Sequence, residues 1–104
     1  MNDDPWRIET IDDLSEHIAY VRGYAPSDFP VEDFLGPDQQ MTLDRAFALL
    51  DDGIAIAYPE DNFAEKRVLL REALSRAHNA YRDGDDIAGA TILQEDFEDQ
   101  IFKS

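Results

Sequence analysis

The sequence contains no cysteine. It can therefore form neither a disulfide nor a thiolate site, whether nucleophilic or metal-binding. Small secreted domains are more often cross-linked by disulfides, and residues 1–5 show neither the basic nor the apolar region of a secretory signal. We therefore expect a cytoplasmic protein. The longest apolar run, Ile54 to Tyr58, is far shorter than the ~20 residues of a membrane span, so none is expected.

Positive charge is also scarce. Nine Lys and Arg residues face 24 Asp and Glu residues, which leaves a net charge of -15. Direct binding of nucleic acid is disfavoured, because the phosphate backbone repels such a surface, and an anionic membrane is disfavoured for the same reason. Hydrophobic residues make up 43% of the 104 residues, which is enough for one core and argues against disorder. We expect a single helical domain over residues 1–104.

The first helix has clear signals at both ends. Thr10 is a favourable N-cap, and Asp13 stands three residues later, as in a capping box. Gly23 is typical of a helix stop. Between them, apolar residues recur at spacings of 3, 4 and 3, which marks one face of a helix over residues 11–22. The residues of this face are Ile11, Leu14, Ile18 and Val21.

A proline-rich segment follows. Residues 24–37 contain three of the five prolines, which predicts an irregular connection. A short helical turn is expected over residues 30–35. We also expect Phe29, Phe34 and Leu35 to lie on the core and anchor the connection.

The second helix is expected to begin at a cap on Asp38 and to run to Tyr58, where Pro59 ends it. The alternation of residues 54–58 also fits a half-buried strand. An isolated strand would have no pairing partner, however, so a helix weakened at Gly53 is the simpler interpretation.

Two further helices complete the pattern. Asn62 and Glu65 form a start signal for a helix that ends near Asp83, and Asp85 can cap the last helix after Gly84. The expected buried stripes are Phe63, Leu70, Leu74, Ala77 and Tyr81, then Ile87, Ala90, Leu93, Phe97 and Ile101. Short polar turns between four helices predict a small all-α bundle, with the Pro-rich irregular connection between its first two helices.

The charge is unevenly distributed. Residues 62–84 carry five bases and three acids, whereas residues 1–61 sum to -12 and residues 85–104 to -5. We expect this basic helix to lie among acidic neighbours and to reduce repulsion in the folded chain. Its basic residues are Lys66, Arg67, Arg71, Arg76 and Arg82.

No motif indicates catalysis or a cofactor. His17 and His78 are single histidines on separate predicted helices, and we expect surface or boundary positions for both, because zinc sites recruit several ligands. The run from Asp83 to Asp86 resembles a calcium loop, but Ile87 stands where a ligand is required. There is no nucleophile motif and no glycine-rich phosphate loop. We therefore expect no enzyme activity, no cofactor and no metal site.

Several carboxylates are poorly explained by helix capping. Asp51 and Asp52 lie inside a helix, and the cluster of residues 95–99 lies late in the last helix with only Lys103 to offset it. Tyr58 stands beside further acids at a helix end, and Trp6 is expected either to pack over the bundle or to serve as an interface anchor. The predicted partner-binding residues are Asp51, Asp52, Tyr58, Glu60, Asp61, Glu95, Asp96, Glu98 and Asp99.

In size, acidity and helical character the chain resembles bacterial immunity proteins of colicin-like or contact-dependent growth inhibition toxins. The resemblance implies an inhibitor of a basic protein, a nuclease toxin above all, whose cationic substrate groove an acidic protein can occupy. No motif carries the resemblance, so it assigns no residue a role.

Two other interpretations remain open. The carboxylates could imitate phosphates, which would make the chain a nucleic-acid mimic or regulator that occupies a DNA- or RNA-binding protein. Alternatively, the excess of Asp over Glu, 16 to 8, could reflect adaptation to high salt.

We predict that reversing the charge of Asp51 and Asp52, or of Glu60 and Asp61, slows association with the basic partner, because fewer carboxylates steer the encounter. Association rates measured with an identified partner check this prediction. An unchanged rate after both pairs are reversed would show that the predicted patch is wrong.

Overall fold

Helices account for all of the regular structure in the described residues, 6–25, 27 and 29–102, of the computed structural model, and no strand occurs among them. They are α1 (Ile11–Tyr24), α2 (Leu43–Ala57), α3 (Ala64–Arg82) and a last helix in three parts. Those parts are α4 (Asp86–Ile92), a π-helical segment η3 (Leu93–Glu98) and α5 (Asp99–Phe102). Two short 3₁₀ turns, η1 (Pro37–Gln39) and η2 (Asp61–Phe63), precede α2 and α3. The predicted all-α architecture is confirmed.

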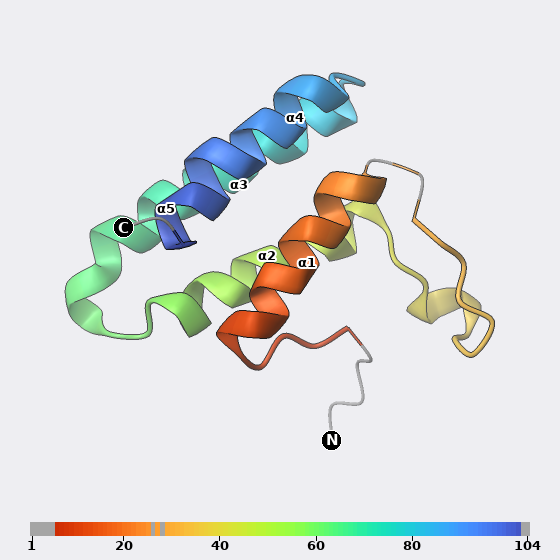
Figure 1. Ribbon diagram of the computed structural model, residues 1–104, viewed down its shortest axis with the longest axis horizontal. Coiled ribbons are helices and arrows are strands. Elements are labelled where there is room, and N and C mark those ends of the chain that lie inside the picture. The colour runs from red at the N-terminus through yellow and green to blue at the C-terminus, as the bar shows by residue number, and fades with distance from the viewer. Residues whose placement is uncertain (1–5, 26, 28, 103–104) are drawn as a thin grey trace.

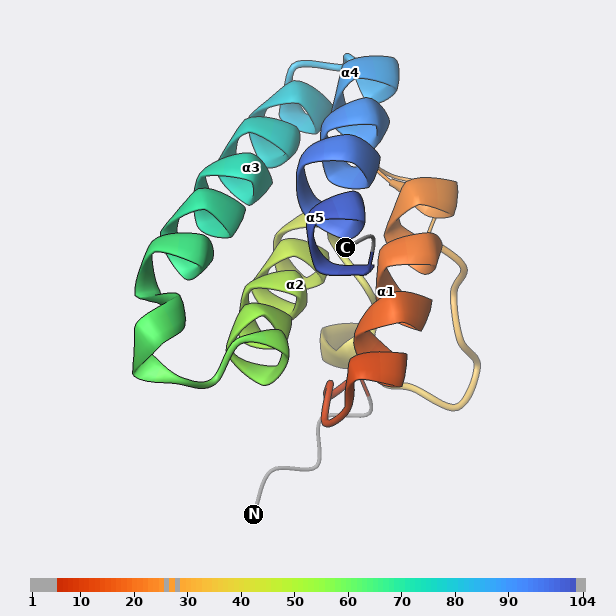
Figure 2. The ribbon, with the colours of Figure 1, turned by 60° about the vertical axis from the view of Figure 1, so that its left-hand side comes forward.

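The helices pack in a closed ring. α1 contacts α2, α2 contacts α3, α3 contacts both α4 and η3, and η3 contacts α1. Figures 1 and 2 both show α3 and α4 side by side, with the chain reversing between them. The connection between α1 and α2 projects away from the helices at the right of Figure 1. The largest fully buried side chains inside the ring are Phe97, Leu14, Ile18, Leu50, Ile54, Leu70, Leu93 and Val21.

The capping box predicted at the start of α1 is present. The Thr10 hydroxyl accepts a hydrogen bond from the Asp13 amide at 3.1 Å, and the Asp13 carboxylate accepts from the amides of Thr10 and Glu9. These bonds, the one from Glu9 first, lower the pKa of the Asp13 carboxyl. Local side-chain chemistry alone therefore fixes where α1 begins.

The predicted stop at Gly23 is wrong. Among the described glycines only Gly84 has a positive φ, and α1 continues through Gly23 to Tyr24. The chain becomes extended at Ala25, which precedes a proline in the sequence, and the residue before a proline is sterically disfavoured in helical conformation. Ile11, expected on the buried face, is exposed.

The cap predicted at Asp38 is also wrong. Asp38 lies in η1, and Thr42 caps α2 by accepting a hydrogen bond from the Arg45 amide at 3.1 Å. The proposed passage of α2 through Gly53 is confirmed, since the helix ends at Ala57 with Tyr58 as its C-cap. Residues 54–57 are therefore helical, and the strand interpretation is excluded.

The connection between α1 and α2 differs from expectation in its middle. Residues 30–35 form no helix, only one hydrogen-bonded turn closed between the Leu35 amide and the Glu32 carbonyl oxygen, and Phe34 is 79% exposed instead of lying on the core. Phe29 does pack against the core, and Leu35 is half-buried. The expected irregular segment is thus present, but Phe34, expected on the core, faces outward, as does Val31.

The ends of α3 and α4 follow the sequence closely, with one exception. Gly84 adopts φ +83° just beyond α3, and the Asp85 carboxylate caps α4 by accepting from the Ala88 amide at 3.1 Å. Asn62 does not cap α3, because it lies inside η2. Phe63 and Ile87, at the outer ends of the predicted stripes, are exposed, whereas the remaining stripe residues are buried or half-buried.

Two glycine substitutions test the packing of α1 on α2. A Cβ at Gly53 would lie 2.4 Å from Cδ1 of Leu14, which is fully buried, whereas a Cβ at Gly23 would meet nothing within 4 Å. We expect Gly53→Ala to lower the free energy of unfolding by about 1–3 kcal/mol through overpacking. Gly23→Ala should raise it by about 0.5–1 kcal/mol through helix propensity.

Denaturant titration of both variants measures this difference. If Gly53→Ala proves as stable as Gly23→Ala, the close approach of α1 and α2 at this point is wrong.

Candidate partner-binding surface

The cations of α3 are directed at the two neighbouring helices. Arg71 pairs with Asp51 of α2 at 2.9 Å, and Arg76 pairs with Asp96 of η3 at 3.0 Å. Arg82 contacts the Asp44 carboxylate of α2 at 3.0 Å. The expectation that α3 lies among acidic neighbours and offsets their charge is confirmed.

Asp44 receives a second partner. Nε2 of His78 lies 2.9 Å from the same carboxylate, and the imidazole stacks on Phe47 at 4.6 Å between ring centroids. The hydrogen bond from Arg82, followed by that from His78, lowers the pKa of the Asp44 carboxyl. His78 therefore occupies the boundary position expected for it.

The two remaining cations of α3 contact the turn between α2 and α3. Arg67 donates to the carbonyl oxygens of Tyr58 at 2.8 Å and Glu60 at 2.7 Å, which holds the turn after α2. The ammonium group of Lys66 lies 5.8 Å from the centre of the Tyr58 ring and 3.5 Å from Oε1 of Gln100. Both cations therefore have their partners within the chain.

The basic residues outside α3 are engaged as well. Arg22 of α1 pairs with Glu98 at 3.3 Å, Arg7 lies 3.8 Å from Glu9, and Arg45 donates to the Asp38 carbonyl oxygen at 3.1 Å. Every Lys and Arg in residues 6–102 therefore has a partner within the chain. Lys103, the expected counter-ion of the last helix, lies outside the described residues.

Three of the predicted site residues form ion pairs within the chain. Asp51, Asp96 and Glu98 were selected because no nearby base in the sequence offsets them, but Arg71, Arg76 and Arg22 do so from other helices. That reason for selecting them is therefore wrong, because it considered neighbours in sequence and not in space. Asp99 is half-buried at the start of α5.

Tyr58 and the last helix, which carries the predicted acids of residues 95–99, meet at one end of the bundle. The Tyr58 hydroxyl donates to the Gln100 carbonyl oxygen at 3.1 Å, and its ring packs edge-on against Phe63 at 5.3 Å. Nε2 of the Gln100 side chain in turn donates to the Glu95 carbonyl oxygen at 3.4 Å. Tyr58 thus lies next to the last helix. Asp51 instead contacts Arg71 on α3, one helical turn after Arg67.

Several predicted acids remain outward. Asp52, Glu60, Asp61 and Glu95 are exposed, and none of them forms an ion pair with any described residue. These four carboxylates, unlike the paired ones, are available to a cation on another molecule.

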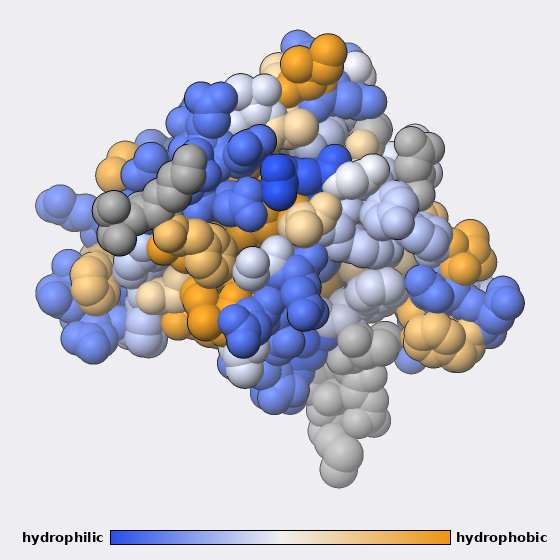
Figure 3. Space-filling view, viewed as in Figure 1, coloured by the Kyte–Doolittle hydropathy of each residue, from blue (hydrophilic) through white to orange (hydrophobic). Residues whose placement is uncertain are grey.

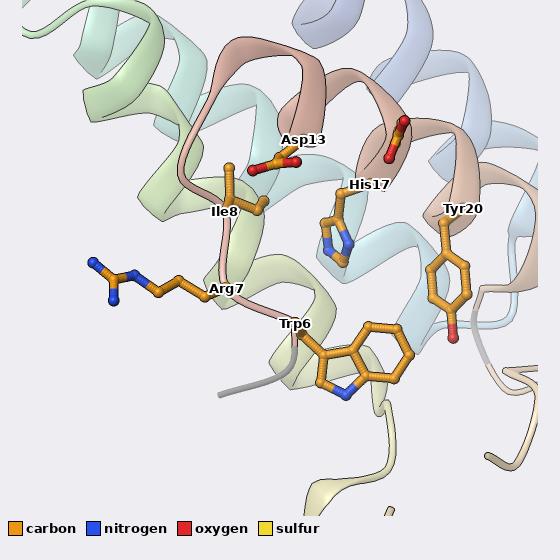
Figure 4. Close-up of a pocket in the computed structure, with 7 residues that line it drawn as sticks. Trp6, Arg7, Ile8, Asp13, His17 and Tyr20 are labelled. Atoms are coloured by element: carbon orange, nitrogen blue, oxygen red, sulfur yellow. The ribbon is translucent and has the colours of Figure 1, made fainter. Parts of the chain in front are cut away.

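A pocket of about 250 Å³ lies beneath the start of α1. Figure 4 shows Asp13, His17 and Tyr20 projecting from α1, and Arg7 pointing away from the His17 ring. The Trp6 indole N–H donates to the Gln39 carbonyl oxygen at 2.8 Å, and its ring packs against Tyr20 at 5.6 Å. Of the two roles expected for Trp6, packing on the bundle is the one that the structure shows.

His17 is buried, contrary to expectation. Only 8% of the residue is exposed, and its Nε2–H donates to the Ala46 carbonyl oxygen at 3.0 Å, which links α1 to α2. Burial lowers the pKa of the imidazole, although the hydrogen bond to Ala46 acts in the opposite direction. The signal for this position was its place between Leu14 and Ile18 on the buried stripe of α1.

Sequence reasoning also missed the projecting loop, which we define as residues 29–36. Residues 23–44 contain five acids and no Lys or Arg, a charge pattern that could have singled out this segment. Within the loop, Val31 and Phe34 are the most exposed large apolar residues.

Comparison of the chain with family models, curated proteins and solved structures found no match. In the described part of the chain, no group of three or more potential metal ligands comes together. No helix there is both long enough and apolar enough to cross a bilayer.

The buried imidazole predicts a pH dependence. Because the pKa of His17 is lower in the folded chain than the usual ~6.5 of an unfolded one, acid protonates the unfolded state first. We expect the free energy of unfolding to be highest above about pH 6.5 and to fall as the pH drops towards 5.

The matched variant is His17→Gln, whose amide can still donate to Ala46 but does not titrate. Denaturant titrations between about pH 7.5 and pH 5.5 should show a smaller slope for this variant than for the natural protein. Equal slopes would mean that His17 is not the buried titrating group.

Proposed function

We propose that this protein is an acidic binding module that neutralises a basic protein, and that its partner is a nuclease toxin for which it serves as the immunity protein. The observation that carries the proposal is the contrast between the two signs of charge. The described cations all have partners within the chain, whereas carboxylates such as Asp52, Glu60 and Asp61 form no ion pair with any described residue. The molecule therefore presents its surplus negative charge outward.

Such a surface suits a protein that must itself be positively charged. A nuclease binds the phosphate backbone through Lys and Arg, so its substrate groove is cationic. A net charge of -15 accelerates the encounter with such a groove and favours it over other surfaces. Occupying the groove blocks the substrate without any chemistry on the part of the inhibitor.

The first experiment is recovery of the partner. The tagged chain is exposed at low salt to extract from its source cell, and bound proteins are eluted with increasing NaCl. The charge-neutralised variant Asp52→Asn/Glu60→Gln/Asp61→Asn serves as the comparison. We expect a basic nuclease that is retained by the natural chain and is released earlier from the variant.

The recovered protein is then assayed for function. Its nuclease activity should fall to zero at an equimolar amount of the chain, and the association rate should fall roughly tenfold between about 0.05 and 0.5 M salt. Recovery of no basic protein, or of one whose activity is unaffected, would refute the proposal. A chain that folds only in molar salt would instead support adaptation to high salt.

A further inference from the structure

The side chain of Gln40 makes most of the side-chain hydrogen bonds that hold the projecting loop in shape. Oε1 of Gln40 accepts from the Glu32 amide at 2.9 Å, and Nε2 of Gln40 donates to the carbonyl oxygens of Glu32 at 2.9 Å and Leu35 at 3.0 Å. The amide of Gln40 thus closes the loop across its base. The backbone also forms one turn, in which Leu35 donates to the Glu32 carbonyl oxygen at 3.1 Å.

The base of the loop is fixed on one side to α1 and on the other to Trp6, in the segment before α1. Phe29 stacks on Tyr20 of α1, with 5.7 Å between the ring centroids and 23° between the planes. On the other side, Gln39 accepts from the Trp6 indole through its carbonyl oxygen and from the Gly36 amide, at 3.0 Å, through its side chain. The loop therefore has a defined conformation, held by hydrogen bonds and a ring contact at its base.

The loop exposes two of its apolar side chains to solvent. Val31 is 78% exposed and Phe34 is 79% exposed. In Figure 3 the loop at the right of the view carries hydrophobic side chains on either side of hydrophilic ones. Single exposed apolar residues are common, but here a network of hydrogen bonds fixes the backbone that presents two of them.

The charge around these side chains has one sign. Glu32, Asp33 and Asp38 lie in or beside the loop, and the nearest basic residues in the sequence are Arg22 and Arg45. None of these three carboxylates forms an ion pair with a described residue. An exposed aromatic residue on a hydrogen-bonded loop, with carboxylates near it in sequence that form no ion pair with a described residue, complements an apolar recess within a cationic surface.

We propose that the projecting loop is the docking element of this protein, and that Phe34 inserts into an apolar recess on the cationic surface of its partner. The inference rests on the proposed function, since the occupant is the same basic protein. Carboxylates of the loop contact the cations around the recess, and Gln40 acts as a positioning residue. Because the loop is already formed, little conformational entropy is lost when it binds.

A second copy of the chain is a poorer occupant. Each copy carries a charge of -15, so two such loops repel one another and each meets another acidic surface. The other exposed apolar region, a shallow hollow of about 400 Å³ on α3 bordered by Val68 and Leu69, is the side of a helix with no comparable framework around it. The loop is therefore the stronger candidate.

The test uses the purified basic partner and three single variants. Phe34→Ala removes the proposed anchor, Ile87→Ala removes a residue of similar exposure at the start of α4, and Leu69→Ala tests the α3 hollow. We expect Phe34→Ala to raise the dissociation rate at least tenfold with little change in the association rate, because the charge is unaltered. The other two variants should stay within about twofold of the natural chain.

Gln40→Met provides a second readout. It removes the hydrogen bonds across the base of the loop while leaving Phe34 and every charge in place. We expect weaker binding together with faster hydrogen exchange of the Glu32 and Leu35 amides, whereas the helices exchange as before. Tight binding with a loosened loop would show that the loop need not be preformed.

The outcomes separate this inference from the proposed function. If the complex forms and Phe34→Ala dissociates like the natural chain, the docking role of the loop is overturned and the proposed function stands. A selective loss in Leu69→Ala assigns the interface to α3 and also overturns it. Self-association of the free chain that Phe34→Ala abolishes, seen by sedimentation, identifies a second copy as the occupant. Failure to find any inhibited basic protein overturns both proposals.

Discussion

The ion pairs between α3 and its two neighbours are the interaction on which the arrangement of charge in this molecule depends. A chain with a net charge of -15 folds against its own repulsion, and α3 carries five of its nine cations. Arg71 and Arg82 reach α2, while Arg76 reaches η3. Such partly exposed pairs each contribute at most about 1 kcal/mol, so the buried core supplies most of the stability. The pairs decide instead which surface carboxylates have a cation beside them and which do not.

This division has a direct consequence for recognition. Since the described cations are bound within the chain, an approaching molecule meets carboxylates with few compensating charges. Under the proposed function, the long-range field selects basic proteins and speeds their arrival, but it does not fix how they dock. In the proposed complex, the projecting loop fixes the docking geometry, because the side chain of Phe34 can fit a recess of matching shape. In this account, charge determines the class of partner and the loop determines the geometry of the complex.

Local rules predicted much of the fold and little of the candidate site. The caps at Thr10 and Asp85 and the left-handed Gly84 depend on contacts within a few residues, which a sequence displays directly. The loop depends on Gln40 reaching back eight residues, and on Trp6 bonding to a residue 33 positions away. The ion pairs of Asp51, Asp96 and Glu98 could not be predicted for the same reason, since their counter-ions are distant in sequence. The π-helical segment η3 has no signal in the sequence that we can identify.

Amide chemical shifts of the labelled chain, recorded as its basic partner is added, test the central claim most directly. The account predicts that the largest changes occur at residues 31–35, with smaller ones at the exposed acids and little change along the buried face of α3. Unchanged loop amides in a saturated complex, with the largest changes at Arg71, Arg76 and Arg82, would contradict it. That pattern would mean that the internal ion pairs open on binding and that the partner contacts α3 instead of the loop.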